Sequence, residues 1–197
     1  LEIRIDSIRH GYRDRNAIDL DPAGVTIPAS SVYANAGIPQ LSVSTNVKYT
    51  QQGYKTAFRL MADDGKQGKA LGEYAVKNLK FKRLAVIDDS TAYGQGLADE
   101  TKEAMAKGGM KEVLYAGIKL GEKDFSALVS KIKASGADLV YWGGLHTEGG
   151  LIVRQMRDQG VKAPLMGGDG ITDDEFAAIA GPGAEGTLMT FSPDPRT

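Results

Sequence analysis

Residues 83–120 read RLAVIDDSTAYGQGLADETKEAMAKGGMKEVLYAGIKL, and the hydrophobic period changes twice along this stretch. RLAVIDD (83–89) is an apolar, β-rich run. The segment 93–109 carries its apolar residues at helical spacing, and EVLYAGIKL (112–120) is β-rich again. Strand, helix and strand in this order predict a right-handed crossover and two parallel strands.

The same alternation continues downstream. Gly109, Gly136 and Gly160 are expected to end three of the helices, because glycine readily takes the left-handed conformation that closes a helix. The pattern predicts an α/β fold with a mostly parallel sheet of βαβ units. The expected elements are a helix at 124–136, a strand at 137–144, a helix at 147–160, a strand at 163–168, a helix near 172–180 and a strand at 186–191.

The upstream part reads as a second piece of the same kind. We expect the chain to cross between the two pieces from Ala62 to Gly65, where DDG interrupts an apolar run. Residues 1–23 contain four arginines and no lysine, so we interpret them as an atypical leader. The elements expected in this part are a helix at 27–37, strands at 38–44 and 54–62, and a helix at about 65–79.

Composition and missing motifs exclude several functions. The chain has 197 residues, a formal net charge of -1 and no cysteine, which argues against nucleic-acid binding and excludes thiolate chemistry. No run approaches the roughly 18 apolar residues of a membrane span. There is no G-x-S-x-G elbow, H-E-x-x-H or P-loop, and YGQG (93–96) supplies only two glycines of a dinucleotide fingerprint. We therefore expect neither catalysis nor a cofactor.

Ligands of parallel α/β sheets bind outside the carboxyl ends of the strands. Asp169 lies in such a loop among three glycines, which let the backbone approach a ligand while the carboxylate accepts hydrogen bonds from a ligand cation. The alternative is that Asp169 caps the following helix or stabilises a turn. The loops expected at this edge are 43–50, 88–96, 143–148 and 167–172.

Other residues of these loops are candidates with ordinary alternatives. Tyr93 could cover a small ligand or simply pack in the core. Ser44, Thr45 and Asn46 suit a ligand carboxylate, although STN is also a common turn or cap. His146, with Glu148 close by, could form a metal site or an acid/base pair, but we favour a capping role and a solvated imidazole.

Six stretches together resemble the leucine/isoleucine/valine-binding proteins, the type I periplasmic solute-binding proteins of branched-chain amino-acid ABC transporters. They follow one another in the family's order and spacing between about Gly24 and Pro195. They read GVTIPASSVYANAGIP (24–39), TQQGYKTAFR (50–59), YGQGLADET (93–101), GEKDFSALVSKIK (121–133), YWGGLHTEGGLIVRQMRDQG (141–160) and GGDGI (167–171).

The resemblance implies two α/β lobes joined by a hinge, closing on an amino acid that is handed to a membrane permease. It implies a periplasmic location, no cofactor and no catalysed reaction. The expected organisation is an atypical leader (1–23), part of the first lobe (24–63), a near-complete second lobe (64–191) and a crossing segment (192–197).

The resemblance also assigns roles to individual residues. Asp169 matches the acidic position that receives the ligand's α-ammonium, where leucine-binding members commonly have Glu. Tyr93 matches the tyrosine that closes over the ligand, and Ser44 and Thr45 match the loop that holds the α-carboxylate. Leu145 matches a wall position that is often aromatic. Leu at this position and Asp in place of Glu reshape the pocket, so the resemblance implies Leu, Ile or Val as ligand, or another small amino acid such as γ-aminobutyrate.

Departures from the family pattern raise other expectations. Ala23 stands where the family has a carboxylate-binding serine, and first-lobe segments before Gly24 and after Pro195 are missing. We therefore expect a truncated chain that binds its ligand weakly or not at all. The alternatives are a remnant of a frameshifted gene or the ligand-sensing domain of a receptor. An unpaired sheet edge in the partial first lobe could lead to a homodimer or to aggregation.

Overall fold

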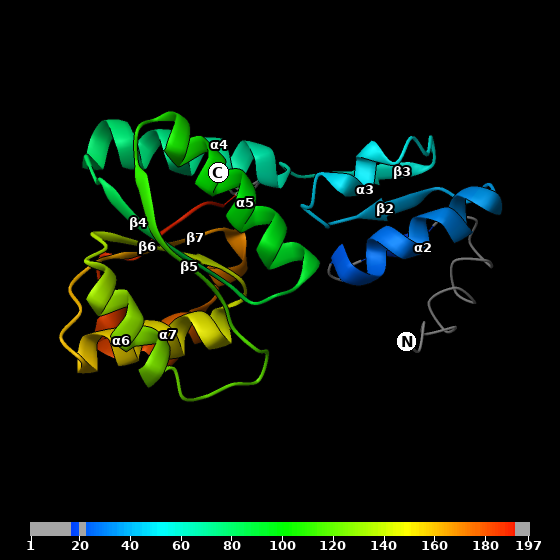
Figure 1. Ribbon diagram of the computed structural model, residues 1–197. Helices are drawn as coiled ribbons and strands as arrows, with labels where there is room; N and C mark the ends of the chain where they lie inside the picture. Colours follow the sequence, from blue (N-terminus) through cyan, green and yellow to red (C-terminus); the bar gives the residue numbers. More distant parts are fainter. Residues whose placement is uncertain (1–16, 20–22, 192–197) are drawn as a thin grey trace. The chain divides into compact units, whose positions relative to one another are not determined.

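The computed structural model of the chain describes residues 17–19 and 23–191. The chain divides into two compact units, Leu1–Asp64 and Gly65–Thr197. Each unit contains a parallel sheet of its own, and the helices and strands of each can be followed in Figure 1. The two units are therefore described one after the other.

The described residues of the first unit form three parallel strands with two helices. Its elements are β1 (Ala17–Asp19), α2 (Ala23–Asn35), β2 (Gln40–Ser42), α3 (Lys48–Gln51) and β3 (Ala57–Arg59). The strand order is β1-β2-β3. Tyr49 on α3 is fully buried, and its hydroxyl donates a 2.9 Å hydrogen bond to the carbonyl of Gln40. This bond fixes α3, and with it the loop after β2, against the sheet.

The second unit is a five-stranded parallel sheet with the order β5-β4-β6-β7-β8. Its elements are α4 (Asp64–Tyr74), the π-helical turn η1 (Ala75–Leu79), β4 (Arg83–Asp88), α5 (Ala92–Lys107), β5 (Lys111–Gly117), α6 (Ser126–Ser135), β6 (Leu139–Gly143), α7 (His146–Asp158), β7 (Leu165–Gly167), the 3-10 turn η2 (Asp169–Ile171), α8 (Asp174–Ala180), the 3-10 turn η3 (Gly181–Ala184) and β8 (Leu188–Met189).

The sheet of the second unit separates two hydrophobic cores. Along β4, Leu84 and Val86 join the cluster beneath α4 and α5, whereas Ala85 and Ile87 join the cluster beneath α6, α7 and α8. Helices thus cover both faces of the sheet, as Figure 1 shows. This explains why the strand is apolar at consecutive positions, which is typical of a parallel sheet buried on both sides.

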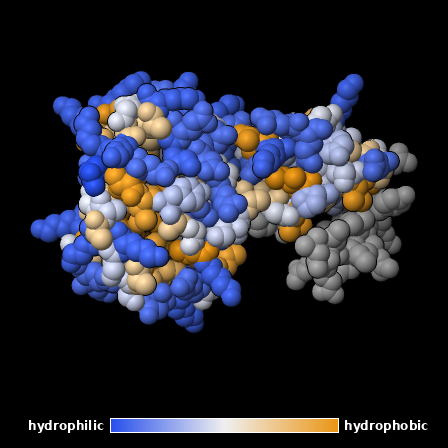
Figure 2. Space-filling view, in the orientation of Figure 1, coloured by the Kyte–Doolittle hydropathy of each residue, from blue (hydrophilic) through white to orange (hydrophobic). Residues whose placement is uncertain are grey.

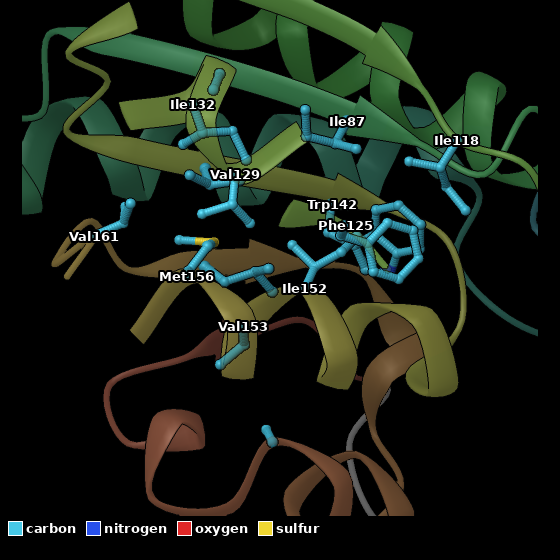
Figure 3. Close-up of a cluster of buried hydrophobic side chains, with 14 of the residues drawn as sticks. Ile87, Ile118, Phe125, Val129, Ile132, Trp142, Ile152, Val153, Met156 and Val161 are labelled. Atoms are coloured by element: carbon cyan, nitrogen blue, oxygen red, sulfur yellow. The ribbon is translucent and has the colours of Figure 1, made fainter. Parts of the chain in front are cut away.

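The core beneath α6 and α7 contains the single tryptophan of the chain (Figure 3). Trp142 of β6 lies beside Phe125, and Ile152 of α7 packs close to both. All three side chains are almost completely buried. Burying a large apolar side chain contributes about 1.5–3 kcal/mol, so Trp142 is held firmly in place.

Hydrophilic residues predominate on the outer side of α4 and α5 (Figure 2). Lys107 pairs with Glu103 at 2.7 Å, and Lys77 pairs with Glu73 at 3.0 Å, both one helical turn apart. Exposed pairs of this kind add little to the stability of a helix, because water screens the attraction between the two charges. We therefore interpret this surface as an ordinary solvated face.

The structure confirms the predicted α/β fold class. Each strand and helix predicted between residues 83 and 191 is present, although the strands are shorter than their apolar runs. Gly109, Gly136 and Gly160 all have positive φ angles, as expected of residues that follow a helix. The predicted strands are longer than the observed ones because they were read from hydrophobicity, which indicates burial. Buried residues continue past the last hydrogen bond between neighbouring strands.

Part of the expected leader is structured. Residues 17–19 form β1, which pairs in parallel with β2, and Ala23 begins α2. Residues 1–16 and 20–22, as well as the crossing segment expected at 192–197, lie outside the described residues.

The direction in which the chain adds strands to the sheet of the second unit reverses after β5. The chain runs from β4 outward to β5 and then returns past β4 to β6, so α5 and α7 leave the sheet on opposite faces. Ligands of open α/β sheets bind at this kind of switch point, outside the carboxyl ends of the strands. The loops after β4, β6 and β7 meet at that edge.

Candidate functional site

Three of the predicted site residues follow neighbouring strands of the second unit. Tyr93 lies in the first turn of α5 after β4, Leu145 is the residue before α7, and Asp169 begins η2 after β7. Because β4, β6 and β7 are adjacent in the sheet, their carboxyl ends bring these three residues to the same edge.

Tyr93 and Asp169 are in direct contact. The Tyr93 hydroxyl donates a hydrogen bond to Asp169 Oδ1 at 3.0 Å and accepts one from the backbone N–H of Gly170, also at 3.0 Å. Burial, followed by the negative charge of Asp169, raises the pKa of Tyr93 above its ordinary value. The hydroxyl is therefore protonated near neutral pH and remains a donor to the carboxylate.

The glycines around Asp169 permit this close packing. A Cβ atom on Gly170 would lie 2.6 Å from the Tyr93 hydroxyl oxygen and 2.9 Å from the carbonyl oxygen of Gly144. A Cβ atom on Gly168 would collide with the Leu97 side chain. Both distances for Gly170 are too short for real contacts, so the loop needs glycine there to admit the tyrosine ring.

Gln67 is a residue of this site that sequence reasoning missed. Its Nε2 donates to Asp169 Oδ1 at 3.1 Å, and its Oε1 accepts from the backbone N–H of Asp169 at 3.3 Å. The two residues are 102 positions apart, and Gln67 lies in a helix whose local pattern carries no ligand-binding signal. Only the tertiary structure brings them together.

The two carboxylate oxygens of Asp169 have different surroundings. Oδ1 accepts hydrogen bonds from both Tyr93 and Gln67, whereas Oδ2 accepts none from the part of the chain that the structure describes. Asp169 is only partly buried. The carboxylate does not cap α8, because Asp173 does so by accepting a 2.8 Å bond from the N–H of Glu175. An oriented carboxylate with one open oxygen can receive a cationic group.

Leu145 is held in place through its backbone. Its carbonyl oxygen accepts hydrogen bonds from Trp142 Nε1 at 3.0 Å and from the N–H of Gly149 at 3.2 Å. The side chain itself is 42% exposed, and its Cδ2 lies 3.1 Å from the position that a Cβ on Gly170 would take. A fixed, exposed aliphatic group thus lies beside the Asp169 loop.

In the first unit, Ser44 and Thr45 follow β2 and are nearly fully buried. Their side-chain oxygens have no hydrogen-bond partner among the described residues. Asn46 has the turn-forming role that the sequence left open for this cluster, since its Oδ1 accepts a 3.0 Å bond from the N–H of Lys48. Buried hydroxyls without partners are costly, and a ligand oxygen would satisfy them.

His146 and Glu148 do not form a pair with each other. His146 Nε2 lies 3.2 Å from a carboxylate oxygen of Glu175, and Glu148 Oε1 accepts a 3.1 Å bond from the N–H of Gly121. The expected capping role is wrong for these side chains, because the first turn of α7 has no side-chain cap. In the described part of the chain, no group of three His, Asp or Glu is arranged to hold a metal ion.

A family model described as periplasmic binding protein matches residues 17–197. The chain belongs to the periplasmic binding protein family. This finding and the relatives below confirm the resemblance on which the sequence analysis rested. Among the described elements, none of the helices has the length and apolar composition needed to cross a membrane.

Similar members of the periplasmic binding protein family include curated bacterial proteins. A Leu/Ile/Val-binding protein homolog 1 of Brucella suis is 56% identical over 88% of this chain and 47% of the relative. An amino acid binding protein of Pseudomonas aeruginosa is 53% identical over 87% of this chain and 46% of the relative. The chain spans about half the length of the curated relatives it matches.

Two solved periplasmic binding proteins have similar structures. The leucine binding protein LivK of Thermotoga maritima has a TM-score of 0.89 and 26% identity, covering 97% of this chain and 55% of that protein. The substrate binding protein LivJ of Streptococcus pneumoniae, solved in complex with isoleucine, has a TM-score of 0.77 and 26% identity, covering 89% and 51%. These comparisons confirm the fold class.

Proposed function

We propose that this chain is part of an extracytoplasmic binding protein that takes up a small aliphatic amino acid for an ABC import system. The observation that carries the proposal is Asp169. Tyr93 and Gln67 hold its Oδ1, while Oδ2 is open and the residue is only partly buried. A carboxylate fixed in this way is suited to the α-ammonium group of an amino acid, through a charge-assisted hydrogen bond.

The α-carboxylate of the ligand is assigned to the first unit. Ser44 and Thr45 carry buried hydroxyls that lack partners in the described part of the chain, and a carboxylate accepts hydrogen bonds from such donors. The hydroxyls of Ser44 and Thr45 are thus chemically complementary to the carboxylate end of an amino acid.

An aliphatic ligand side chain fits the remaining groups of the second unit. The Tyr93 hydroxyl is engaged by Asp169 and Gly170, so it has no proton left to donate to a polar ligand side chain. Leu145 offers an exposed apolar surface beside them. The names of the relatives support this choice, since they refer to Leu, Ile and Val, and LivJ was solved with isoleucine.

The proposed role is binding without catalysis, with release of the ligand to a membrane permease. An acid that has one oxygen fixed by two donors is suited to holding a charged group of a ligand in one position. A periplasmic location follows from the role in import, and the partner is the permease of the transporter.

The proposal is tested by thermal melts and calorimetric titrations of the purified chain. We expect leucine, isoleucine or valine to raise the midpoint, since a ligand at about a hundred times its Kd adds roughly 2.7 kcal/mol to the native state. Isocaproate, which is leucine without its ammonium, should have no effect. γ-Aminobutyrate is included as a ligand that carries its ammonium group on the γ-carbon in place of the α-carbon.

Asp169→Asn is the matching variant, because it keeps the shape and the Oδ1 acceptor but removes the charge. We expect it to melt near the wild-type temperature and to lose the leucine-dependent rise. Binding of leucine that survives this substitution, or equal binding of isocaproate, would show that Asp169 does not hold the ammonium. A cooperative melt that no amino acid shifts would overturn the proposed function for this chain.

A further inference from the structure

Gln67 lies in the first turn of α4, where the second unit begins, and its side chain is 7% exposed. Its carboxamide makes three hydrogen bonds. Nε2 donates to Asp169 Oδ1 at 3.1 Å, while Oε1 accepts from the Asp169 N–H at 3.3 Å and from Thr190 Oγ1 at 2.6 Å. Both the nitrogen and the oxygen of this buried carboxamide are thus hydrogen-bonded.

These bonds allow only one orientation of the amide. Rotating it by half a turn would place Oε1 against the negatively charged Asp169 Oδ1 and Nε2 against the Asp169 N–H, so an acceptor would face an acceptor and a donor a donor. The Gln67 carboxamide thus contacts both the carboxylate and the backbone N–H of Asp169. The rotation of the carboxylate is therefore fixed together with the position of the loop that carries it.

Thr190 extends this connection to the last strand. It follows directly after β8, and it is partly buried. Gln67 consequently ties three distant segments together: the beginning of α4, the loop after β7 and the end of β8. These are the first helix and the last strand of the unit, with the proposed ligand acid between them.

We propose that Gln67 is a positioning residue for ligand recognition, which turns Asp169 so that Oδ2 is open to the ammonium and couples this acid to both ends of the second unit. The inference rests on the proposed function of Asp169. Gln67 does not itself contact the ligand. Its carboxamide is hydrogen-bonded to Asp169 and Thr190, so Gln67 affects the ligand only through the position of Asp169.

A matched pair of variants tests the proposal. Gln67→Met keeps the length of the side chain and removes all three hydrogen bonds. Gln155→Met is the control, because the Gln155 carboxamide also bonds through both its oxygen and its nitrogen, away from the site: its Oε1 accepts from the Phe125 N–H at 2.7 Å and its Nε2 donates to the Lys123 carbonyl at 2.8 Å. Gln67→Met loses three side-chain hydrogen bonds and Gln155→Met loses two, and only Gln67 contacts Asp169.

The first measurement is amide hydrogen exchange by NMR in the ligand-free chain. In Gln67→Met the Asp169 amide should exchange about tenfold faster, since it loses its acceptor, while the Gly170 amide keeps the Tyr93 hydroxyl and its protection. In Gln155→Met both amides should be unchanged. An Asp169 amide that is equally protected in Gln67→Met would overturn the proposal whether or not the chain binds leucine.

The second measurement is the leucine affinity. We expect Kd to rise about tenfold in Gln67→Met and to stay near the wild-type value in Gln155→Met. Without Gln67 the Asp169 carboxylate must be ordered when the ammonium binds, and immobilising one side chain costs about this factor. Equal affinities of the two variants would reduce Gln67 to a structural residue. Should Gln67→Met not fold, Thr190→Val removes one donor to Oε1 and must weaken leucine binding by a smaller factor for the coupling to hold.

Wild-type behaviour separates the two proposals. A wild-type chain that ignores leucine refutes the proposed function, and the exchange rates then still decide whether Gln67 positions Asp169. A wild-type chain that binds leucine with a Kd unaffected by Gln67→Met refutes the positioning role alone.

Discussion

Tyr93 and Asp169 share a 3.0 Å hydrogen bond although 76 positions separate them in the chain. The same hydroxyl accepts the N–H of Gly170, so one tyrosine satisfies the side chain of the acid and the backbone of its loop. This arrangement fixes the start of α5 against the loop after β7. The proposed ligand acid is therefore part of the packed framework of the unit.

We expect Tyr93→Phe to lower the free energy of unfolding at neutral pH by about 1–3 kcal/mol, because it leaves the Gly170 N–H without its acceptor. Denaturant unfolding monitored by circular dichroism measures this change. Tyr74→Phe, which removes the hydroxyl of an exposed tyrosine, should change the stability by less than about 0.5 kcal/mol.

The same variant should also change the alkaline limb of the stability curve. The pKa of Tyr93 is raised in the folded chain by burial and then by Asp169, so the unfolded chain loses the phenolic proton first. The stabilising contribution is fully present below about pH 10 and is lost as the pH rises above that value. Tyr93→Phe should show a shallower decline from about pH 10 upward, and an identical slope in both proteins would contradict this explanation.

Asp89 is predicted to destabilise the chain at neutral pH. Burial, opposed by hydrogen bonds from Thr91 and reinforced by the charges of Asp88 and Glu148, raises the pKa of its carboxyl group. The contribution to stability is present below the unfolded pKa of about 3.9 and is lost as the pH rises through the folded value. Asp89→Asn should thus equal or exceed the wild type in stability at pH 7.

The gain in Asp89→Asn requires that its structural bonds survive. Asn Oδ1 can still accept from the backbone N–H and the hydroxyl of Thr91, at 2.9 and 2.6 Å in the present chain. Asp89→Ala removes both bonds and should cost about 1–3 kcal/mol. Unfolding curves recorded at pH 4 and pH 7 test the pair, and an Asn variant that is less stable only at pH 7 would refute the buried-charge argument.

Gly94 allows α5 to begin directly against the end of β6. A Cβ atom there would collide with Asp89 Oδ1 and the carbonyl oxygen of Gly143. Gly94→Ala should therefore cost at least about 1–3 kcal/mol in thermal or denaturant unfolding, since a backbone carbonyl cannot move aside. Gly24→Ala in α2 has nothing within 4 Å and should cause no loss; similar losses in the two variants would count against a local collision.

Leu145→Ala separates ligand recognition from stability. The Leu145 side chain is exposed, and its backbone is held by Trp142 and Gly149 whatever the side chain is. We expect the melting temperature to change little and the affinity for leucine or isoleucine to fall by about tenfold, because apolar contact area is lost. Titrations with leucine and with alanine as ligands check this, since the smaller ligand should be affected less.

Much of the fold could be predicted from the sequence because periodicity is a local property. The apolar run of β4, the helical spacing of α5 and the glycines after three helices are all readable over a few residues. The parallel sheet followed from their alternation, and with it the expectation that Tyr93, Leu145 and Asp169 lie in loops at one edge. The lengths of the strands were overestimated, since apolar runs extend past the ladder.

The alternatives that the sequence left open at Asp169 required coordinates. Asp173 caps α8, so the carboxylate of Asp169 is free for another role. In the first unit, Asn46 forms the local turn, and this leaves the hydroxyls of Ser44 and Thr45 without partners among the described residues. Which side chain caps a helix or forms a turn depends on which of several similar polar groups lies within hydrogen-bond distance of the backbone N–H. The local sequence pattern does not specify these distances.

The sequence by itself determined that this chain is an α/β protein of parallel βαβ units, and which loops hold its candidate residues. Only the tertiary structure decided that Tyr93 and Gln67 both bind Asp169 Oδ1 and that Oδ2 is open. The physical reason is one of range. Hydrophobic periods act between neighbours in the chain, whereas these hydrogen bonds join groups 76 and 102 positions apart and exist only when packing brings them within about 3 Å.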